Sequence, residues 1–344
     1  MRTMRFLRRE PPALPHLTIA SRVVDKMVRN AVHYETETGE SLVGFTVKAS
    51  GAIEPELFVV ETIPPDDSAI RQGAYFEQGD DIQGDIFNWW SDNWDLYREG
   101  QRNKPDWRWN VSLSSLGDWH KHPGTLTEPS WGDAGTAREY IHDRISGSPQ
   151  LLVILATVWD SEQARVAEPV MAAGAANEFA VPLKVPIDEA TTVRLDCWYM
   201  SRYTRGFVPL TPTVGTDLPE LFPIAWHLRQ PERARREVDA LIADGFSVSV
   251  EQYPAGGSTP LAICLLLERP NSHNAIIVVT EADFPATCPT VRTAPIAALP
   301  GKPDDKNPLA GLWQASTPVD KSVYPAWNPS DRLVDFVKAI EAKR

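Results

Sequence analysis

The most informative segment of this 344-residue chain reads Gly117-Asp-Trp-His-Lys-His-Pro-Gly-Thr-Leu-Thr-Glu-Pro-Ser-Trp-Gly-Asp133. Residues 107–119 predict a strand that leads into His120, and a helix is expected after Ser130. Side chains along a strand alternate between its two faces, so His120 and His122 should project from the same side. The segment therefore predicts a strand, a loop and a helix, with two imidazoles on one face.

The flanking segments alternate between helix and strand. Residues 151–159 are apolar apart from Thr157, which is typical of a strand buried on both faces. Residues 42–47 and 52–63 predict two more strands. Residues 17–34 predict a strand entry followed by a helix, because their valines and methionine recur at helical spacing. Over residues 17–160 this alternation predicts an α/β layered fold.

Two domains are expected from the length and from the distribution of proline. We expect a basic, proline-rich tail at residues 1–16, a first domain at 17–175, an irregular connecting segment at 176–222 and an α+β domain at 223–344. The last of these contains one predicted helix, three predicted strands and a C-terminal amphipathic helix.

Composition narrows the classes of function. A formal net charge of −12 argues against a general nucleic-acid binder, which needs a basic surface to meet phosphates. The longest apolar run, residues 151–159, is far shorter than the roughly 20 residues of a membrane-spanning helix. Three cysteines without a Cys-x-x-Cys pair favour neither a disulfide framework nor a cysteine zinc site. We therefore expect a cytoplasmic protein without membrane or nucleic-acid partners.

His120, His122 and Asp133 are candidate zinc ligands. Two neutral imidazoles and a carboxylate leave one position of a tetrahedral zinc ion open to water, whose pKa the metal lowers to about 7. Hydrolysis also needs a nearby base that takes the proton of this water. Taken singly, these residues have simpler interpretations. Most isolated His-x-His pairs bind no metal, and Ser130 with Asp133 fits a helix capping box.

Together, these residues resemble the motif of the JAB/MPN (JAMM) zinc metalloproteases, which reads His-x-His-Pro, six residues, then Ser-x-x-Asp. Every position is matched here, by His120, His122, Pro123, Ser130 and Asp133. The resemblance covers about residues 17–165 and implies an MPN-type (deaminase-like) mixed sheet flanked by helices. It implies one zinc ion per chain, bound by both histidines and Asp133. It also implies that Ser130 donates a hydrogen bond to the oxyanion of the tetrahedral intermediate.

The family also has an upstream glutamate, in a segment of the form Glu-x-x-Gly-x-Leu-x-Gly. Residues 37–44 read Glu-Thr-Gly-Glu-Ser-Leu-Val-Gly, and alignment on the last leucine and glycine places that glutamate at Glu37. The resemblance implies that Glu37 holds the attacking water, takes its proton and passes the proton to the leaving amine. Where the family pattern has its first glycine, this chain has Glu40, and a glycine stands one position earlier, at Gly39. Glu40 and Glu35 therefore remain alternatives for the base.

Several tryptophans lie between the predicted strands. Tryptophan and tyrosine dominate many binding surfaces, so Trp90 and Trp94 are candidate substrate-binding residues. Alternatively, they pack a helix predicted at residues 81–99 against the sheet. Strand alternation points Trp119 and Lys121 away from the histidines, so we expect Trp119 in the core and assign Lys121 no role.

The second half contains Phe284-Pro-Ala-Thr-Cys-Pro-Thr-Val291 and then Trp327-Asn-Pro-Ser. With the order of helix and strands, these segments resemble a ubiquitin-conjugating (E2) or RWD-type domain. An active conjugating enzyme has a cysteine between the two segments, and no cysteine follows Cys288. The resemblance therefore implies a non-conjugating variant that binds a ubiquitin-like protein or a conjugation enzyme. The alternative is an unrelated α+β domain packed on the first.

JAMM proteases commonly cut peptide or isopeptide bonds after the C-terminal tail of ubiquitin or a ubiquitin-like protein. The resemblance thus implies a deubiquitinase-like zinc isopeptidase whose partners are such a protein or its conjugates. Activating and conjugating (E1- and E2-type) enzymes are further candidate partners. Two alternatives stay open: a non-catalytic MPN-type scaffold, and a zinc amidohydrolase of a small molecule. Scaffolds usually lack a metal ligand, whereas this chain keeps all three.

Overall fold

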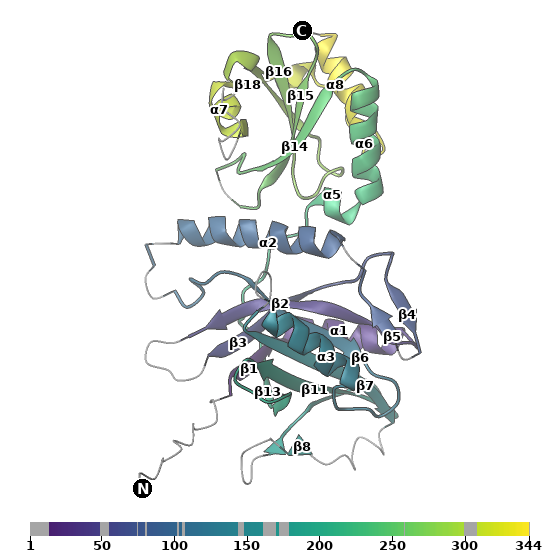
Figure 1. Ribbon diagram of the computed structural model, residues 1–344. Helices are drawn as coiled ribbons and strands as arrows, with labels where there is room; N and C mark the ends of the chain where they lie inside the picture. The colour runs from purple at the N-terminus through teal and green to yellow at the C-terminus, as the bar shows by residue number, and fades with distance from the viewer. Residues whose placement is uncertain are drawn as a thin grey trace. The chain divides into compact units, whose positions relative to one another are not determined.

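A computed structural model of the chain describes residues 14–48, 55–73, 75–79, 81–101, 103–104, 107–143, 148–160, 170–171, 179–257, 259–298 and 308–343 (Figure 1). Most of the tail predicted at residues 1–16 lies outside this described part. The chain divides into two compact units, Met1–Leu221 and Phe222–Arg344. Both units mix helices with strands, as the predicted α/β class requires.

The first unit is built on a mixed sheet with the strand order β10-β11-β7-β6-β2-β3-β1-β13, in which β12 also pairs with β11. Its strands are β1 (His16–Ala20), β2 (Gly39–Val47), β3 (Glu56–Ile63), β6 (Ser114–Lys121), β7 (Gln150–Asp160), β10 (Leu183–Pro186), β11 (Thr191–Ser201), β12 (Val208–Leu210) and β13 (Pro212–Gly215). The helices are α1 (Ser21–His33), α2 (Asp81–Gly100) and α3 (Trp131–His142). Two small hairpins complete the unit, β4 (Ile70–Gln72) with β5 (Tyr75–Glu77) and β8 (Val170–Met171) with β9 (Phe179–Ala180).

The expected irregular connection at residues 176–222 is wrong for most of its length. Strand β11 pairs along its whole length with the central strand β7 and belongs to the first unit. Two charged residues, Arg194 and Asp196, interrupt its apolar pattern. They face the same side of the strand and form two buried hydrogen bonds of 2.8 Å with each other. Three of the prolines that suggested a loop, Pro186, Pro209 and Pro212, lie in short strands at the margins of the sheet, where a missing N–H is tolerated.

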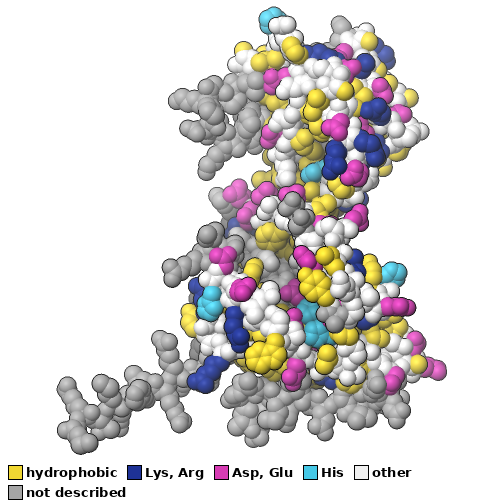
Figure 2. All heavy atoms as spheres, turned by 45° about the vertical axis from the view of Figure 1, so that its right-hand side comes forward, with side chains coloured by type: hydrophobic (Ala, Val, Ile, Leu, Met, Phe, Trp, Pro, Cys, Tyr) yellow, Lys and Arg dark blue, Asp and Glu magenta, His cyan; other side chains and the backbone are white. Residues whose placement is uncertain are grey.

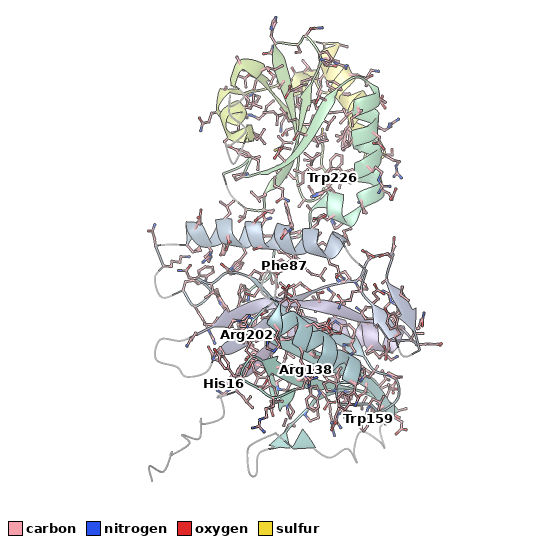
Figure 3. All side chains as sticks on the ribbon, in the orientation of Figure 1. His16, Phe87, Arg138, Trp159, Arg202 and Trp226 are labelled. Atoms are coloured by element: carbon pink, nitrogen blue, oxygen red, sulfur yellow. The ribbon has the colours of Figure 1, made fainter. Side chains whose placement is uncertain are left out.

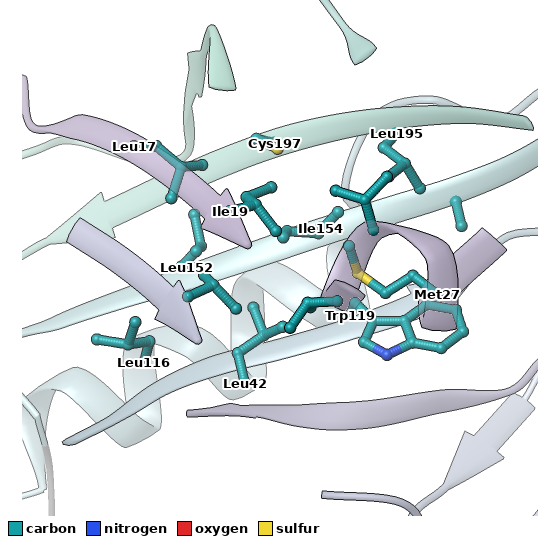
Figure 4. Close-up of a cluster of buried hydrophobic side chains, with 14 of the residues drawn as sticks. Leu17, Ile19, Met27, Leu42, Leu116, Trp119, Leu152, Ile154, Leu195 and Cys197 are labelled. Carbon is teal, nitrogen blue, oxygen red and sulfur yellow. The ribbon is translucent and has the colours of Figure 1, made fainter. Parts of the chain in front are cut away.

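Helices cover both faces of this sheet. On one face, α1 buries Val23 and Met27 against Trp119, Leu152 and Ile154 (Figure 4). On the other face, α3 packs against the alternate residues of β7 and β11. That second cluster consists of Ala137, Ile141, Leu151, Val153, Leu155, Trp198 and Met200. Strand β7 is therefore buried on both faces, as its almost entirely apolar sequence predicts.

Strand β6 contains a β-bulge immediately before the histidine motif. Its pairing with β2 skips one residue, because Leu42 lies opposite Gly117 whereas Val43 lies opposite Ser115. Leu116 and Trp119 are three positions apart, yet both are buried in the cluster beneath α1. Regular alternation would place them on opposite faces, and the extra residue removes this conflict. After the bulge, Asp118 and His120, which flank Trp119, point to the opposite face of the sheet, where α3 lies.

Gly117 should be essential for this bulge. Its φ is +139°, and a Cβ atom there would lie 1.8 Å from the carbonyl oxygen of Leu152. We expect Gly117→Ala to lower the free energy of unfolding by more than about 2 kcal/mol, measured by urea denaturation. The control is Gly84→Ala in α2, where a Cβ meets nothing within 4 Å. That variant should be neutral or stabilised by up to about 1 kcal/mol. Equal stability of Gly117→Ala and wild type would contradict a glycine requirement.

The second unit is a sheet of order β14-β15-β16-β17-β18, antiparallel throughout, with helices around it. Its strands are β14 (Ser247–Tyr253), β15 (Ala262–Glu268), β16 (Asn274–Thr280), β17 (Thr290–Pro295) and β18 (Thr317–Pro318). The helices are α5 (Trp226–Arg229), α6 (Pro231–Ala243), α7 (Pro308–Ala315) and α8 (Leu333–Glu341), with short 3-10 turns at Ile296–Ala298 and Lys321–Val323. The helix, three strands and final helix expected from the sequence are all present.

A ring cluster joins the start and end of this unit. Trp226, labelled in Figure 3, packs on Phe284 with ring centroids 4.7 Å apart. Phe284 also contacts Trp327, whose indole N–H donates a 2.9 Å hydrogen bond to the carbonyl oxygen of Pro285. Buried Glu237 of α6 accepts a 2.8 Å hydrogen bond from the backbone N–H of Leu333, the first residue of α8.

None of the helices in the described parts of the chain is long and apolar enough to cross a membrane.

Candidate metal centre

The fold brings the three predicted ligands together. His120 lies near the end of β6, His122 directly follows that strand, and Asp133 occupies the first turn of α3. The Nε2 atoms of the two histidines are 3.1 Å apart. Asp133 offers one carboxylate oxygen to each of them, at 3.6 Å in both cases. All three side chains are largely shielded from solvent, so the group is held in place by its surroundings.

Hydrogen-bond partners fix the tautomers of both imidazoles. The Nδ1 atom of His120 lies 2.8 Å from Oδ1 of Asp118, and Nδ1 of His122 lies 3.1 Å from the carbonyl oxygen of Leu126. A carboxylate and a carbonyl oxygen only accept, so in neutral imidazoles both Nδ1 atoms carry the hydrogen. Both Nε2 atoms then present lone pairs to each other and to the Asp133 carboxylate. This is a set of donors that a cation would satisfy.

The two imidazole nitrogens have nearly the spacing that tetrahedral zinc requires. Zn–N and Zn–O bonds of about 2.0–2.1 Å at tetrahedral angles place ligand atoms about 3.3 Å apart. The two Nε2 atoms, 3.1 Å apart, lie near that value, and each of them has a different oxygen of Asp133 at 3.6 Å. Among the described residues, this is the group of His, Cys, Asp and Glu side chains whose ligand atoms converge in this way, within 4.8 Å of one another.

The electrostatics keep the aspartate ionised. Burial opposes the charged form of Asp133, but its interactions with His122, His120 and Ser130 outweigh burial and hold the pKa of this carboxyl well below its usual range. For His120, burial opposes protonation, while the hydrogen bond and charge of Asp118 raise its pKa above the ordinary value. Asp133 is thus anionic at neutral pH, as a metal ligand must be.

Ser130 begins α3 as its N-cap. Its Oγ accepts a 3.2 Å hydrogen bond from the backbone N–H of Asp133, and its own backbone N–H donates a 2.6 Å bond to Oδ2 of Asp133. The capping-box interpretation is therefore confirmed, and the same carboxylate also faces the histidines. The bond from the Asp133 amide uses a lone pair of the hydroxyl, whose hydrogen can still donate. Ser130 lines the cavity beside the candidate ligands.

The three candidate bases lie in different environments. Glu37 lines the same cavity, of about 490 Å³, as both histidines and Asp133. Burial raises the pKa of Glu37, and the nearby histidines partly offset this rise. Glu40 points to the opposite face, where it accepts a 2.7 Å hydrogen bond from Asn30 and lies 3.4 Å from Lys26. Glu35 is exposed. Of the three, the structure thus places Glu37 in the cavity.

The β4–β5 hairpin forms a wall of this cavity. Tyr75 and Phe76 line it, and the carbonyl oxygen of Gln72 accepts a 3.2 Å hydrogen bond from the Glu37 backbone N–H. A Cβ atom at Gly39 would lie 2.9 Å from the Phe76 ring and 2.3 Å from the Trp119 carbonyl oxygen. A residue with a side chain would therefore not fit at position 39.

Trp90 and Trp94 do not reach the cavity. Both are buried in the first unit, 4% and 2% exposed, and neither is among the residues that line the cavity. Trp94 packs on Phe45 with ring centroids 4.8 Å apart and donates a 2.8 Å hydrogen bond to the carbonyl oxygen of Val111. Their predicted substrate-binding role is corrected to helix packing. Trp119 is fully buried, as expected.

Other cavity residues were not identified from the sequence: Gln78, Asp118, Leu126 and Thr136. The spacing of Asp118, two positions before His120, was the available signal for one of them. Figure 2 shows histidine side chains (cyan) at the surface of the first unit, among hydrophobic and acidic side chains. Trp131, next to Ser130, is 91% exposed.

No protein-family model matches the chain, and no curated protein matches it.

Proposed function

We propose that the first unit is a zinc-dependent peptidase or isopeptidase of the JAMM type, with an MPN-type fold, that cleaves after the C-terminal tail of a ubiquitin-like protein. The observation that carries this proposal is the convergence of two Nε2 lone pairs, 3.1 Å apart, on the carboxylate of Asp133. His120, His122 and Asp133 would hold one zinc ion. When bound, zinc supplies a Lewis acid that polarises a carbonyl and lowers the pKa of water.

The remaining steps belong to the side chains around the ligands. Glu37 accepts a proton from the attacking water and delivers it to the amine that leaves. Its burial in the cavity raises its pKa, which makes it a stronger base for the first transfer. The Ser130 hydroxyl donates a hydrogen bond to the oxygen on which negative charge develops. Tyr75, Phe76 and Leu126 offer the apolar surface along which an extended tail would lie.

For the second unit we propose a non-conjugating ubiquitin-conjugating-like or RWD-like module. The antiparallel strands between α6 and α8, and the contact of Trp327 with Phe284 and Pro285, support this fold. No cysteine follows Cys288, so the module would bind a ubiquitin-like protein or a conjugation enzyme without forming a thioester. We place the pathway in the cytoplasm, where the free thiols Cys197, Cys264 and Cys288 would stay reduced.

The proposal is tested by zinc content and cleavage together. The full chain should contain one zinc per molecule by mass spectrometry, and His120→Ala should lose it. The zinc-loaded chain should release a fluorescent protein fused behind a ubiquitin tail, and His120→Ala should not. Zinc-free wild type that binds ubiquitin without cleavage would instead support the scaffold. Hydrolysis of simple amides, but not of the fusion, would support a small-molecule amidohydrolase.

Ser130 has a structural and a proposed catalytic role, which two substitutions separate. Ser130→Ala should slow cleavage of the fusion by roughly 10- to 1000-fold, because the oxyanion loses a donor. It should also destabilise the chain by about 1 kcal/mol, since the cap of α3 is lost. Ser130→Gly removes the same hydroxyl but costs only a few tenths of a kcal/mol as a cap. Slow turnover in both variants, with zinc retained, supports the donor role. Wild-type turnover in Ser130→Gly contradicts it.

A further inference from the structure

We propose that Asp118 is a positioning residue for the metal centre, which holds His120 in the one tautomer and orientation that can bind a divalent cation. This inference rests on the proposed zinc centre and adds a residue that lies outside the motif. Asp118 would not contact the ion, and its effect would pass entirely through the imidazole of His120.

The hydrogen bond between them is short and well placed. Oδ1 of Asp118 lies 2.8 Å from Nδ1 of His120, and the His120 side chain is only 13% exposed. Both residues follow the bulge at Gly117 on the same strand and, being two apart, share one face. In the part of the chain that the structure describes, no lysine or arginine forms an ion pair with Asp118. The carboxylate is thus dedicated to the imidazole.

The two histidines are held in different ways. The Nδ1 atom of His122 bonds to the backbone oxygen of Leu126, at 3.1 Å, so no side-chain substitution removes that partner. His120 depends instead on a side chain, and a charged one. A carboxylate partner fixes the tautomer of a ligand imidazole and raises its basicity, which strengthens metal binding. The centre therefore has one ligand that a single substitution can release.

Without Asp118, a competing arrangement becomes available. The 3.1 Å between the two Nε2 atoms is also a good hydrogen-bond distance. If His120 carried its hydrogen on Nε2, it would donate to Nε2 of His122, and this bond would use the lone pair that a metal needs. Asp118 prevents this by holding the hydrogen on Nδ1. The carboxylate thus keeps the two imidazoles from closing the site on each other.

Zinc affinity of the full chain, measured by competition with a chelator, tests this inference. Asp118→Ala should raise the zinc Kd by roughly 10- to 100-fold. Asp118→Asn should raise it less, because the amide oxygen can still accept from Nδ1–H. The control is Asp95→Ala, which removes an exposed carboxylate of α2 paired with Arg98 and should leave the Kd unchanged. Thermal melting of the zinc-free variants shows whether each is folded.

The tautomer of His120 gives a readout independent of zinc. Long-range ¹⁵N–¹H correlation spectra of the zinc-free protein at pH 8 should show the hydrogen on Nδ1 in wild type. In Asp118→Ala the Nε2–H form should gain population, and Asp118→Asn should remain closer to wild type. If Asp118→Ala does not fold, the Asn variant carries the comparison. Its Kd must then exceed that of wild type and of Asp95→Ala.

Failure of this inference differs from failure of the proposed function. If wild type binds no zinc, the metal centre itself is wrong. If wild type binds zinc and both Asp118 variants bind it equally well with an unchanged His120 tautomer, the centre stands and the positioning role is overturned. The role is supported if the zinc Kd rises in Asp118→Ala, rises less in Asp118→Asn, and the His120 tautomer changes as described. Loss of stability alone would produce neither.

Discussion

Glu37→Gln is expected to lower turnover of the tail fusion by roughly 100- to 10,000-fold without releasing zinc. The amide has nearly the shape of the carboxylate but cannot accept the proton of the attacking water. Glu37 lines the cavity beside the ligands and is not one of the three converging donors, so the zinc centre should persist. Initial rates, with zinc content measured on the same samples, check both halves of this expectation.

The two rejected candidates for the base provide matched controls. Glu35→Gln should turn over like wild type, because the exposed side chain lies outside the cavity. Glu40→Gln should mainly lower stability, since it weakens a buried group bonded to Asn30, Lys26 and Thr62. Its thermal midpoint should fall, while the rate per folded molecule stays near wild type. A Glu37→Gln variant as active as wild type, with either control inactive, would assign the base elsewhere.

The candidate ligands could be predicted because their placement is encoded locally. His120 and His122 share a face through strand alternation, and Ser130 and Asp133 meet through a helix cap. Neither relation depends on distant contacts. The two interpretations of Asp133 are also compatible, because Oδ2 accepts from the Ser130 backbone while both carboxylate oxygens face the histidines. The helix cap thus holds the carboxylate where it faces both histidines.

Features that depend on distant residues could not be predicted. The sequence of β11 does not have the apolar pattern of a buried strand, because it contains Arg194 and Asp196. These two residues neutralise each other inside the fold, and the Arg194 guanidinium lies 5.1 Å from the centre of the Trp159 ring. Sequence rules treat each charge as a solvated residue. The prediction that Trp90 and Trp94 bind substrate was wrong for a related reason. Tryptophan is common in binding surfaces, and only the packing of α2 shows that these two are buried.

The bulge in β6 depends on both local and distant residues. Asp118 and His120 share a face because they are two positions apart on one strand. Which face they share depends on the extra residue, Leu116, whose side chain is buried in the core beneath α1. A sequence alone does not show whether alternation is interrupted, because Leu116 and Trp119 fit a strand in either register. The glycine at position 117 was visible as a residue type, but its positive φ was not.

Asp133→Ala should abolish zinc binding at micromolar metal and, with it, the stabilisation that zinc provides. Removing a partner of a ligand costs 10- to 100-fold in affinity, so removing a ligand should raise the Kd by more than about 100-fold. At a zinc concentration 100 times its Kd, wild type gains about 2.7 kcal/mol from binding. The variant should gain almost nothing, because zinc would no longer bridge β6 and α3. Thermal melts with zinc and with a chelator measure the difference.

Asp133→Asn separates the metal from the cap. The asparagine oxygen can still accept from the Ser130 backbone N–H, so the zinc-free Asn variant should be more stable than zinc-free Asp133→Ala. A neutral amide is a poor zinc ligand, so both variants should lack the zinc-dependent rise in melting temperature. Both substitutions thus remove the response to zinc, while only the alanine weakens the start of α3. A wild-type response to zinc in either variant would mean that this carboxylate caps the helix and does not bind the ion.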